Sequence, residues 1–204
     1  MNWRWEGRGV SYADAHALQR ALVEDRIADR IPDTVVLLEH ADTITVGKSR
    51  GAGANVLDAG GIPVVEVERG GDVTWHGPGQ LVAYPIVRTT DLHAHLRALE
   101  HAVIEVLAGL GLEGGRDPRN SGVWLGPPGS GHKVCSVGIA CRRWVTWHGL
   151  ALNVDPDLER FRRIRPCGFD PSVMTRIADH RSPCPSVEDL VGPTARALIR
   201  ALGG

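Results

Sequence analysis

Three strand-like segments lie close together at residues 121–125, 133–142 and 145–154, and this cluster constrains the fold more than any other feature. The second segment alternates apolar and polar side chains, which is the period of a β-strand. It is joined tightly to the third at residues 142–144, a connection that suits neighbouring antiparallel strands. The sequence therefore predicts a sheet in which successive strands form a meander.

The other predicted elements include more strands than helices. Further strands are expected at residues 34–39, 43–46, 64–69 and 81–87, with a Gly-rich turn at residues 51–53. Pro85 lies within the last of these strands and lacks an N–H group, which predicts a sheet edge or a bulge.

The sequence signals for the predicted helices differ in clarity. The clearest covers residues 91–112, where apolar side chains recur every three or four positions and Gly111 ends the pattern. A helix over residues 11–30 begins at Ser11, with Asp14 three positions later as in a capping box. Shorter pieces are expected at residues 157–163, 171–176 and 186–190, and a final helix at 193–202 with Pro193 near its first turn. This order predicts a single α+β domain over residues 1–204, with mixed or antiparallel sheets and flanking helices packed on one side.

Charge and hydropathy argue against two classes of partner. The 23 basic and 24 acidic residues nearly cancel, which does not favour nucleic-acid binding. The longest apolar stretches, such as residues 34–38 and 81–87, are far shorter than the roughly 20 residues of a membrane span. Residues 1–8 carry no apolar segment of the kind that a secretory signal needs. We therefore expect a cytoplasmic protein that binds neither nucleic acid nor membrane.

Residues 69–80 carry the densest functional signal. Four glycines and one proline leave few side chains for a core here, so the backbone is expected to approach a ligand. A Gly-rich turn after a strand offers N–H groups to an anion, a carbonyl oxygen or a phosphate. The segment has neither the Walker motif nor the glycine spacing of dinucleotide-binding loops. His76 within it fits a general base, a metal ligand or a hydrogen-bonded structural histidine.

Two residues stand out by type and setting. Only two of the 23 basic residues are lysines, Lys48 and Lys133, and a lysine kept among arginines suits chemistry that needs a titratable amine. Cys167 lies in a tight Pro-Cys-Gly turn beside arginines, a setting that favours an accessible thiolate. Cys135 and Cys141 suit small buried side chains on one strand face, and the cysteine spacing does not indicate a metal site. If Lys133 and Cys167 meet in space, the ammonium stabilises the thiolate.

Four motifs in a fixed order resemble the lipoyl(octanoyl) transferase family. They are R-G-G-x-x-T-W-H-G-P-G-Q-x-x-x-Y from Arg69 to Tyr84, K-V-C-S-V-G from Lys133, H-G-L-A-L-N-V from His148 and R-x-x-P-C-G ending at Gly168. Together they span about residues 64–176. The resemblance implies one α/β domain similar to lipoate ligases and to the catalytic domain of biotin protein ligases.

The resemblance also implies a covalent mechanism with a Cys/Lys dyad. Cys167 matches the nucleophile that forms an acyl thioester, and Lys133 matches the residue that activates it. The matches to substrate-lining positions are Arg69, Gly70, Gly71, Asp72, Val73, Thr74, Trp75, His76, Ser136, Val137, Gly138, Gly149, Leu150 and Ala151. Val73, Trp75, Val137 and Leu150 are candidate walls of an apolar slot for the octanoyl chain. No metal and no cofactor are implied.

The implied partners are two kinds of protein. The donor is octanoyl-acyl-carrier protein, and the acceptors are lipoyl domains of 2-oxoacid dehydrogenases and the glycine cleavage H protein. The enzyme itself is expected to be a monomer. An arginine-rich stretch is either a docking face for an acidic carrier protein or a solvated charged face. It consists of Arg142, Arg143, Arg160, Arg162, Arg163 and Arg165.

Two other functions remain open on the sequence. An ATP-dependent lipoate ligase of the same fold also uses a lysine, but it activates the acid as an adenylate and needs no nucleophilic thiol. A non-enzymatic module would keep only an acyl-binding pocket, and the presence of both Lys133 and Cys167 disfavours it.

Overall fold

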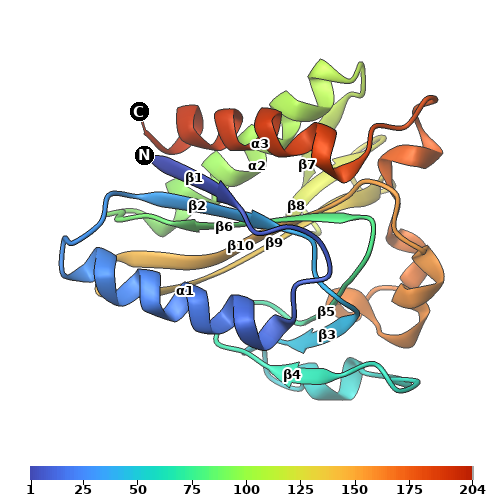
Figure 1. Ribbon diagram of the computed structural model, residues 1–204. Helices are drawn as coiled ribbons and strands as arrows, with labels where there is room; N and C mark the ends of the chain where they lie inside the picture. Colours follow the sequence, from blue (N-terminus) through green and yellow to red (C-terminus); the bar gives the residue numbers. More distant parts are fainter. Residues whose placement is uncertain (204) are drawn as a thin grey trace.

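A seven-stranded sheet lies at the centre of the computed structural model, which describes residues 1–203 (Figure 1). Neighbouring strands are antiparallel except for the first two in spatial order, which run parallel. In spatial order the strands are β1 (Asn2–Trp5), β2 (Thr34–Leu38), β6 (Gln80–Ile86), β10 (Val145–Asn153), β9 (His132–Arg142), β8 (Asn120–Leu125) and β7 (Gly114–Asp117). The predicted meander is confirmed, because β8, β9 and β10 lie side by side.

A second sheet of three strands lies beneath one end of the first (Figure 1). β3 lies between β4, which is parallel to it, and β5, which is antiparallel. The three strands are β3 (Thr43–Val46), β4 (Val64–Glu66) and β5 (Val73–His76). Apolar side chains of β3 and β5 form a separate core with Phe161 and Ile164, which come from the C-terminal part of the chain. The combination of parallel and antiparallel pairs confirms the predicted α+β class with mixed sheets.

The irregular connections consist of short 3-10 turns. η1 (Ala52–Asn55) occupies the predicted Gly-rich turn. The C-terminal part of the chain then contains η2 (Leu158–Arg163), η3 (Pro166–Gly168), η4 (Pro171–Val173) and η5 (Ile177–Asp179). These turns place the predicted nucleophile close to the small sheet, because η3 contacts both β5 and η1.

Helices cover both faces of the large sheet, so the expectation that they pack on one side is wrong (Figure 1). The helices are α1 (Tyr12–Ile27), α2 (Leu92–Gly109) and α3 (Val187–Leu202). α2 and α3 pack against each other on one face, and α1 covers the other. No helix within residues 1–203 is both long enough and apolar enough to cross a membrane.

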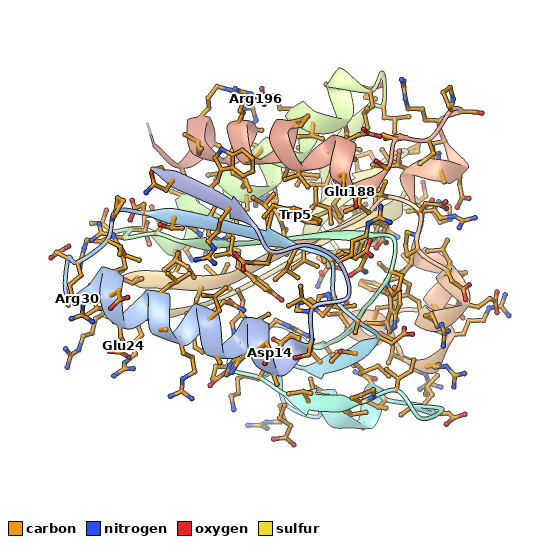
Figure 2. The ribbon with its side chains drawn as sticks, in the orientation of Figure 1. Trp5, Asp14, Glu24, Arg30, Glu188 and Arg196 are labelled. Atoms are coloured by element: carbon orange, nitrogen blue, oxygen red, sulfur yellow. The ribbon has the colours of Figure 1, made fainter. Side chains whose placement is uncertain are left out.

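The alternation of side chains along the central strands explains why both faces are covered. Successive residues of a strand point to opposite sides of a sheet. Leu37 of β2 joins the core beneath α2 and α3, whereas Val36 and Leu38 join the core beside α1. The charged side chains of Asp14 and Glu24 on α1 are exposed on its outer side (Figure 2). The large sheet is therefore buried on both faces along its central strands.

Pro85 lies in the middle of the large sheet, so the expected edge position is wrong. β6 has β2 and β10 as neighbours, and all seven of its residues are buried. β10 is irregular opposite this proline: His148 has a φ of 55°, and its N–H donates to Gln19 Oε1 at 2.8 Å. The Pro85 carbonyl accepts from Thr146 Oγ1 at 3.2 Å. The backbone of β10 thus leaves the regular ladder opposite Pro85, so the missing proline N–H falls at an irregular point of the sheet.

The last two predicted helical pieces are one continuous helix. α3 begins with a capping box in which Ser186 and Asp189 satisfy each other's backbone N–H groups, and it continues through Pro193. Buried side chains from Val187 to Leu198 hold the helix against the sheet. The packing of this stripe outweighs the hydrogen bond that a proline removes from a helix.

The cysteines on β9 differ in burial. Cys135 is buried as expected, but Cys141 is exposed, so its predicted burial is wrong. β9 is eleven residues long, and Cys141 lies next to its exposed end at Arg142. Even spacing places two residues on one face of a strand, but it does not show how much of that face other elements pack against.

Candidate active site

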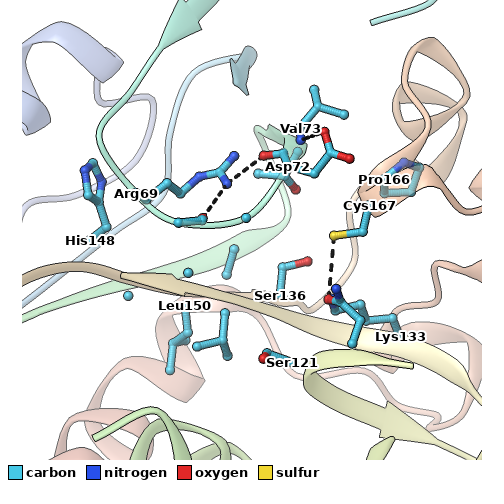
Figure 3. Close-up of a pocket in the computed structure, with 18 of the residues that line it drawn as sticks. Arg69, Asp72, Val73, Ser121, Lys133, Ser136, His148, Leu150, Pro166 and Cys167 are labelled. Carbon is cyan, nitrogen blue, oxygen red and sulfur yellow. Dashed lines mark hydrogen bonds between the residues drawn. The ribbon is translucent and has the colours of Figure 1, made fainter. Parts of the chain in front are cut away.

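A cavity of about 230 Å³ lies between the Gly-rich segment and the β9–β10 hairpin (Figure 3). Of the sixteen residues that the sequence singles out, fifteen line this cavity, including Lys133 and Cys167. The others are Arg69, Gly70, Gly71, Asp72, Val73, Thr74, His76, Ser136, Val137, Gly138, Gly149, Leu150 and Ala151. The structure thus brings together segments that are about a hundred residues apart in the chain.

Trp75 is the one of these sixteen residues that does not line the cavity. It is buried in the core of the small sheet, with its ring edge against Phe161. Its Nε1 donates to Asp42 Oδ1 at 2.9 Å. The neighbouring β5 residues Thr74 and His76 line the cavity. Because side chains alternate along a strand, Trp75 points away from the cavity.

Cys167 lies on the η3 turn, at one end of the cavity (Figure 3). Its φ is 54°, in the left-handed region that non-glycine residues seldom adopt, and Gly168 follows with a φ of 78°. Pro166 precedes it and fixes the start of the turn. Strained backbone of this kind concentrates at functional sites, where it aims a side chain. Here it presents a partly exposed thiol to the cavity.

Lys133 is almost completely buried, with 4% of its surface exposed. Its carbonyl accepts from Thr175 N at 3.0 Å, which links β9 to the segment that follows Cys167. Gly122 on β8 provides the space for the side chain, since a Cβ there would lie 2.6 Å from Lys133 Cε. Burial lowers the pKa of the Lys133 ammonium, and the nearby Cys167 opposes that shift. The residue is therefore an amine whose proton is easier to release than that of a surface lysine.

Asn120 joins the two predicted catalytic residues. Lys133 Nζ donates to Asn120 Oδ1 at 2.5 Å, and Cys167 Sγ lies 3.6 Å from the same oxygen. The sequence did not single out Asn120, because an asparagine at the start of a strand reads as a turn residue. Only the pairing of β8 with β9 brings it beside Lys133.

Arg69 organises the Gly-rich segment from within. Its guanidinium is buried and donates to the carbonyls of Asp72 at 2.7 Å and Thr45 at 2.9 Å. Gly70 N donates to Ile139 O at 2.9 Å, which ties the segment to β9. Gly138 permits this approach, since a Cβ there would lie 3.1 Å from Gly70 O. The predicted close approach of this backbone is therefore made to β9, and it shapes one wall of the cavity.

Histidine and tyrosine side chains line the part of the cavity away from Cys167, where Figure 3 shows His148. His76 is buried, and its Nδ1 lies 3.1 Å from Gln80 Oε1. Burial lowers the pKa of His76 well below its usual value, and His40 adds to this effect. The imidazole is therefore neutral, and its burial together with the Gln80 contact fits the hydrogen-bonded structural histidine among the three interpretations of His76.

The arginine-rich stretch is mostly ion-paired on the surface. Its pairs join Arg142 to Glu24, Arg160 to Asp42 and Asp157, Arg162 to Glu159, and Arg163 to Asp58. Such exposed pairs contribute little to stability and leave less free positive charge for a partner. The arrangement favours the solvated charged face, and docking of a carrier protein on it stays a prediction.

Proteins of known sequence similar to this chain agree on one family. A protein-family model described as the lipoyl protein ligase A/B catalytic domain matches residues 11–199. An octanoyltransferase from Gloeobacter violaceus is 45% identical over 95% of this chain and 87% of its own length. An octanoyltransferase from Thermobifida fusca is 41% identical over 98% of this chain and 89% of its own length.

Solved structures share the fold at low sequence identity. A bi-partite lipoate protein ligase from Thermoplasma acidophilum has a TM-score of 0.66 at 17% identity, covering 98% of this chain and 82% of that one. A biotin protein ligase from Aquifex aeolicus, in complex with biotin and ATP, has a TM-score of 0.60 at 12% identity, covering 99% and 70%. The expected likeness to lipoate and biotin protein ligases is confirmed for the fold. With the family model and the octanoyltransferases, these findings show that the chain belongs to the lipoyl protein ligase A/B catalytic domain family.

Proposed function

We propose that the protein is an octanoyltransferase that works through a thioester on Cys167. The observation that carries the proposal is the shared contact of Cys167 Sγ and Lys133 Nζ with Asn120 Oδ1 at the end of the cavity. A thiol is a strong nucleophile as an anion and a good leaving group afterwards, so it suits transfer between a thioester and an amine. The similarity to proteins named octanoyltransferases supports octanoyl as the acyl group that is transferred.

In the first step, Cys167 Sγ attacks the carbonyl carbon of octanoyl-acyl-carrier protein. A new S–C bond forms, the bond to the carrier's sulfur breaks, and the carrier thiol leaves with the proton that Cys167 gives up. A positive charge at Lys133 stabilises the attacking thiolate. One thioester replaces another, so the step is close to balanced in energy.

In the second step, the ε-amine of an acceptor lysine attacks the Cys167 thioester. An amide bond forms, the bond to Sγ breaks, and one proton passes from the attacking amine to the enzyme. Lys133 is suited to exchange this proton, because its burial already lowers the pKa of its ammonium. The amide product is more stable than the thioester, and this difference drives the transfer.

The cavity offers apolar walls for an octanoyl chain. Leu96, Val137, Ile139 and Leu150 are among the residues that line it. Each buried methylene is worth about 0.8 kcal/mol, so filling the cavity favours a chain that matches its length. We propose lipoyl domains as acceptors, including those of 2-oxoacid dehydrogenases and the glycine cleavage H protein. The monomeric state and the cytoplasmic location stay predictions.

Intact-mass spectrometry tests the mechanism directly. After mixing with octanoyl-acyl-carrier protein alone, we expect the protein to gain one octanoyl group, and peptide mapping to place it on Cys167. Cys167→Ser should lose both the adduct and transfer to a lipoyl domain, while Cys141→Ser, at an exposed thiol, should keep both. Transfer that needs ATP and octanoic acid and that persists in Cys167→Ser would establish an adenylate-forming ligase instead. Binding of the carrier protein without turnover would establish a non-enzymatic module.

A further inference from the structure

We propose that His16, Glu68 and His148 bind one divalent transition-metal ion, of which Zn²⁺ is the natural probe. The residues come from α1, from the segment just before Arg69, and from β10. Their ligating atoms, His16 Nε2, Glu68 Oε2 and His148 Nε2, all lie within 4.8 Å of one another. The proposal is independent of the acyl transfer above, which uses neither His16 nor Glu68.

His148 supplies a second observation that points to a ligand. Its side chain is only 2% exposed, and its Nε2 has no hydrogen-bond partner within residues 1–203. An unsatisfied buried nitrogen costs free energy, so a ligand for it is favoured. The other ring nitrogen, Nδ1, lies 3.5 Å from Tyr12 OH, a contact of the kind that orients metal-bound imidazoles.

The three ligating atoms lie close enough to reach one tetrahedral ion after side-chain movement. Glu68 Oε2 lies 2.9 Å from His16 Nε2 and 4.0 Å from His148 Nε2. Ligands at about 2.0–2.1 Å from a tetrahedral Zn²⁺ lie about 3.3 Å apart, midway between these two separations. The Glu68 side chain is 42% exposed, so it is free to move by the required fraction of an ångström. The two imidazole nitrogens lie within 4.8 Å of each other, so they must approach by up to about 1.5 Å. Two imidazoles and one carboxylate are a set that known zinc sites use, with the fourth position left to water.

Charge and access set the limits of this site. Arg69 lies close enough to lower the pKa of His148, so it also opposes a bound cation. The carboxylate of Glu68 offsets that charge, and the side chains of His16 and Glu68 are open to solvent. A bound ion would join α1, the start of the Gly-rich segment and β10, and would thereby fix the wall of the cavity that His148 lines.

Titration calorimetry with Zn²⁺, on metal-free protein under reducing conditions, tests the proposal. We expect one equivalent to bind, the melting temperature to rise, and Co²⁺ to give the visible absorption of a tetrahedral site. His16→Ala and Glu68→Gln should each weaken binding at least tenfold. His101→Ala, at an exposed histidine of α2, is the matched control and should bind as the parent does.

Three results would overturn the site. They are the absence of saturable one-to-one binding, an equal loss of binding in His101→Ala, and binding abolished by Cys167→Ser but unchanged in both His16→Ala and Glu68→Gln. The melting temperature without metal verifies that each variant is folded. Glu68→Gln keeps the test valid if His16→Ala unfolds, because its side chain is partly exposed and nearly the same size.

Discussion

Asn120 Oδ1 accepts a hydrogen bond of 2.5 Å from Lys133 Nζ and lies 3.6 Å from Cys167 Sγ, so one amide oxygen holds both functional side chains. Asn120→Asp would place a negative charge at this oxygen and offset the ammonium that stabilises a thiolate. We expect alkylation of Cys167 by iodoacetamide at neutral pH to become about tenfold slower, since a negative charge beside the sulfur disfavours the thiolate. Octanoyl transfer at neutral pH should fall about tenfold as a result.

The matched control for this charge is Asn2→Asp, which makes the same substitution on the exposed strand β1. It should leave the alkylation rate of Cys167 and the transfer rate of the parent unchanged. An unchanged alkylation rate in Asn120→Asp would show that Asn120 does not link the two residues electrostatically.

Lys133→Arg should abolish most of the transfer while the positive charge is retained. Arginine does not release its proton near neutral pH, so the second step loses its proton exchange, which is typically worth about 100-fold or more. Single-turnover assays should show that formation of the Cys167 thioester falls less than its transfer to the acceptor. Lys48→Arg, at the other lysine, is the control. Equal rates in Lys133→Arg and the parent would remove the proton-transfer role.

Gly122→Ala should destabilise the protein and displace Lys133. The new Cβ would lie 2.3 Å from Cys135 O and 2.6 Å from Lys133 Cε, at a φ of 131° that favours glycine. We expect the free energy of unfolding in urea to fall by about 2 kcal/mol or more. Gly109→Ala is the opposite case, because its Cβ would meet nothing within 4 Å at the end of α2. That variant should be as stable as the parent or slightly more stable.

Buried neutral histidines should make the fold sensitive to mild acid. Burial lowers the pKa of His95 to about 4, so the folded protein leaves it unprotonated where the unfolded chain binds a proton, between about pH 4 and 6.5. The unfolded state then binds more protons in this window, and stability falls as the pH decreases through it, by about 3 kcal/mol for this residue when complete.

His95→Leu should reduce that acid sensitivity. Urea unfolding at pH 7 and pH 4.5 should show a smaller loss of stability in this variant than in the parent. His101→Leu, at an exposed histidine of the same helix, should behave as the parent does. An identical pH dependence in all three proteins would exclude His95 as a source of the sensitivity.

Local sequence patterns were sufficient to predict most elements but not the neighbours of each strand. The apolar stripe of α2 and the Ser11 cap of α1 depend on nearby residues, and both are present in the structure. The central place of Pro85 depends on the irregular backbone of β10, whose His148 N–H donates to Gln19, a residue distant in the chain. The strands β1, β5 and β7 are short and their sequences show no clear alternation. Their formation therefore depends on pairing with a neighbouring strand.

The candidate site likewise has features that sequence motifs predict and features that depend on the fold. Motifs singled out Lys133 and Cys167, and the structure brings both to one cavity. The contribution of Asn120 depends on the register between β8 and β9, which shifts at Val123 and Trp124 and which no local pattern encodes. The resemblance places Trp75 among the substrate-lining positions, whereas its ring packs in the core of the small sheet against Phe161.

The segment carrying Cys167 is fastened to β9 by few backbone contacts: the bridge between Lys133 and Met174, and the hydrogen bond from Thr175 N to the Lys133 carbonyl. A local release of these backbone contacts would separate Cys167 Sγ from Lys133 Nζ while the two sheets stayed folded. Loss of activity on warming should therefore precede melting, and deuterium uptake at the Thr175 amide should rise in step with that loss.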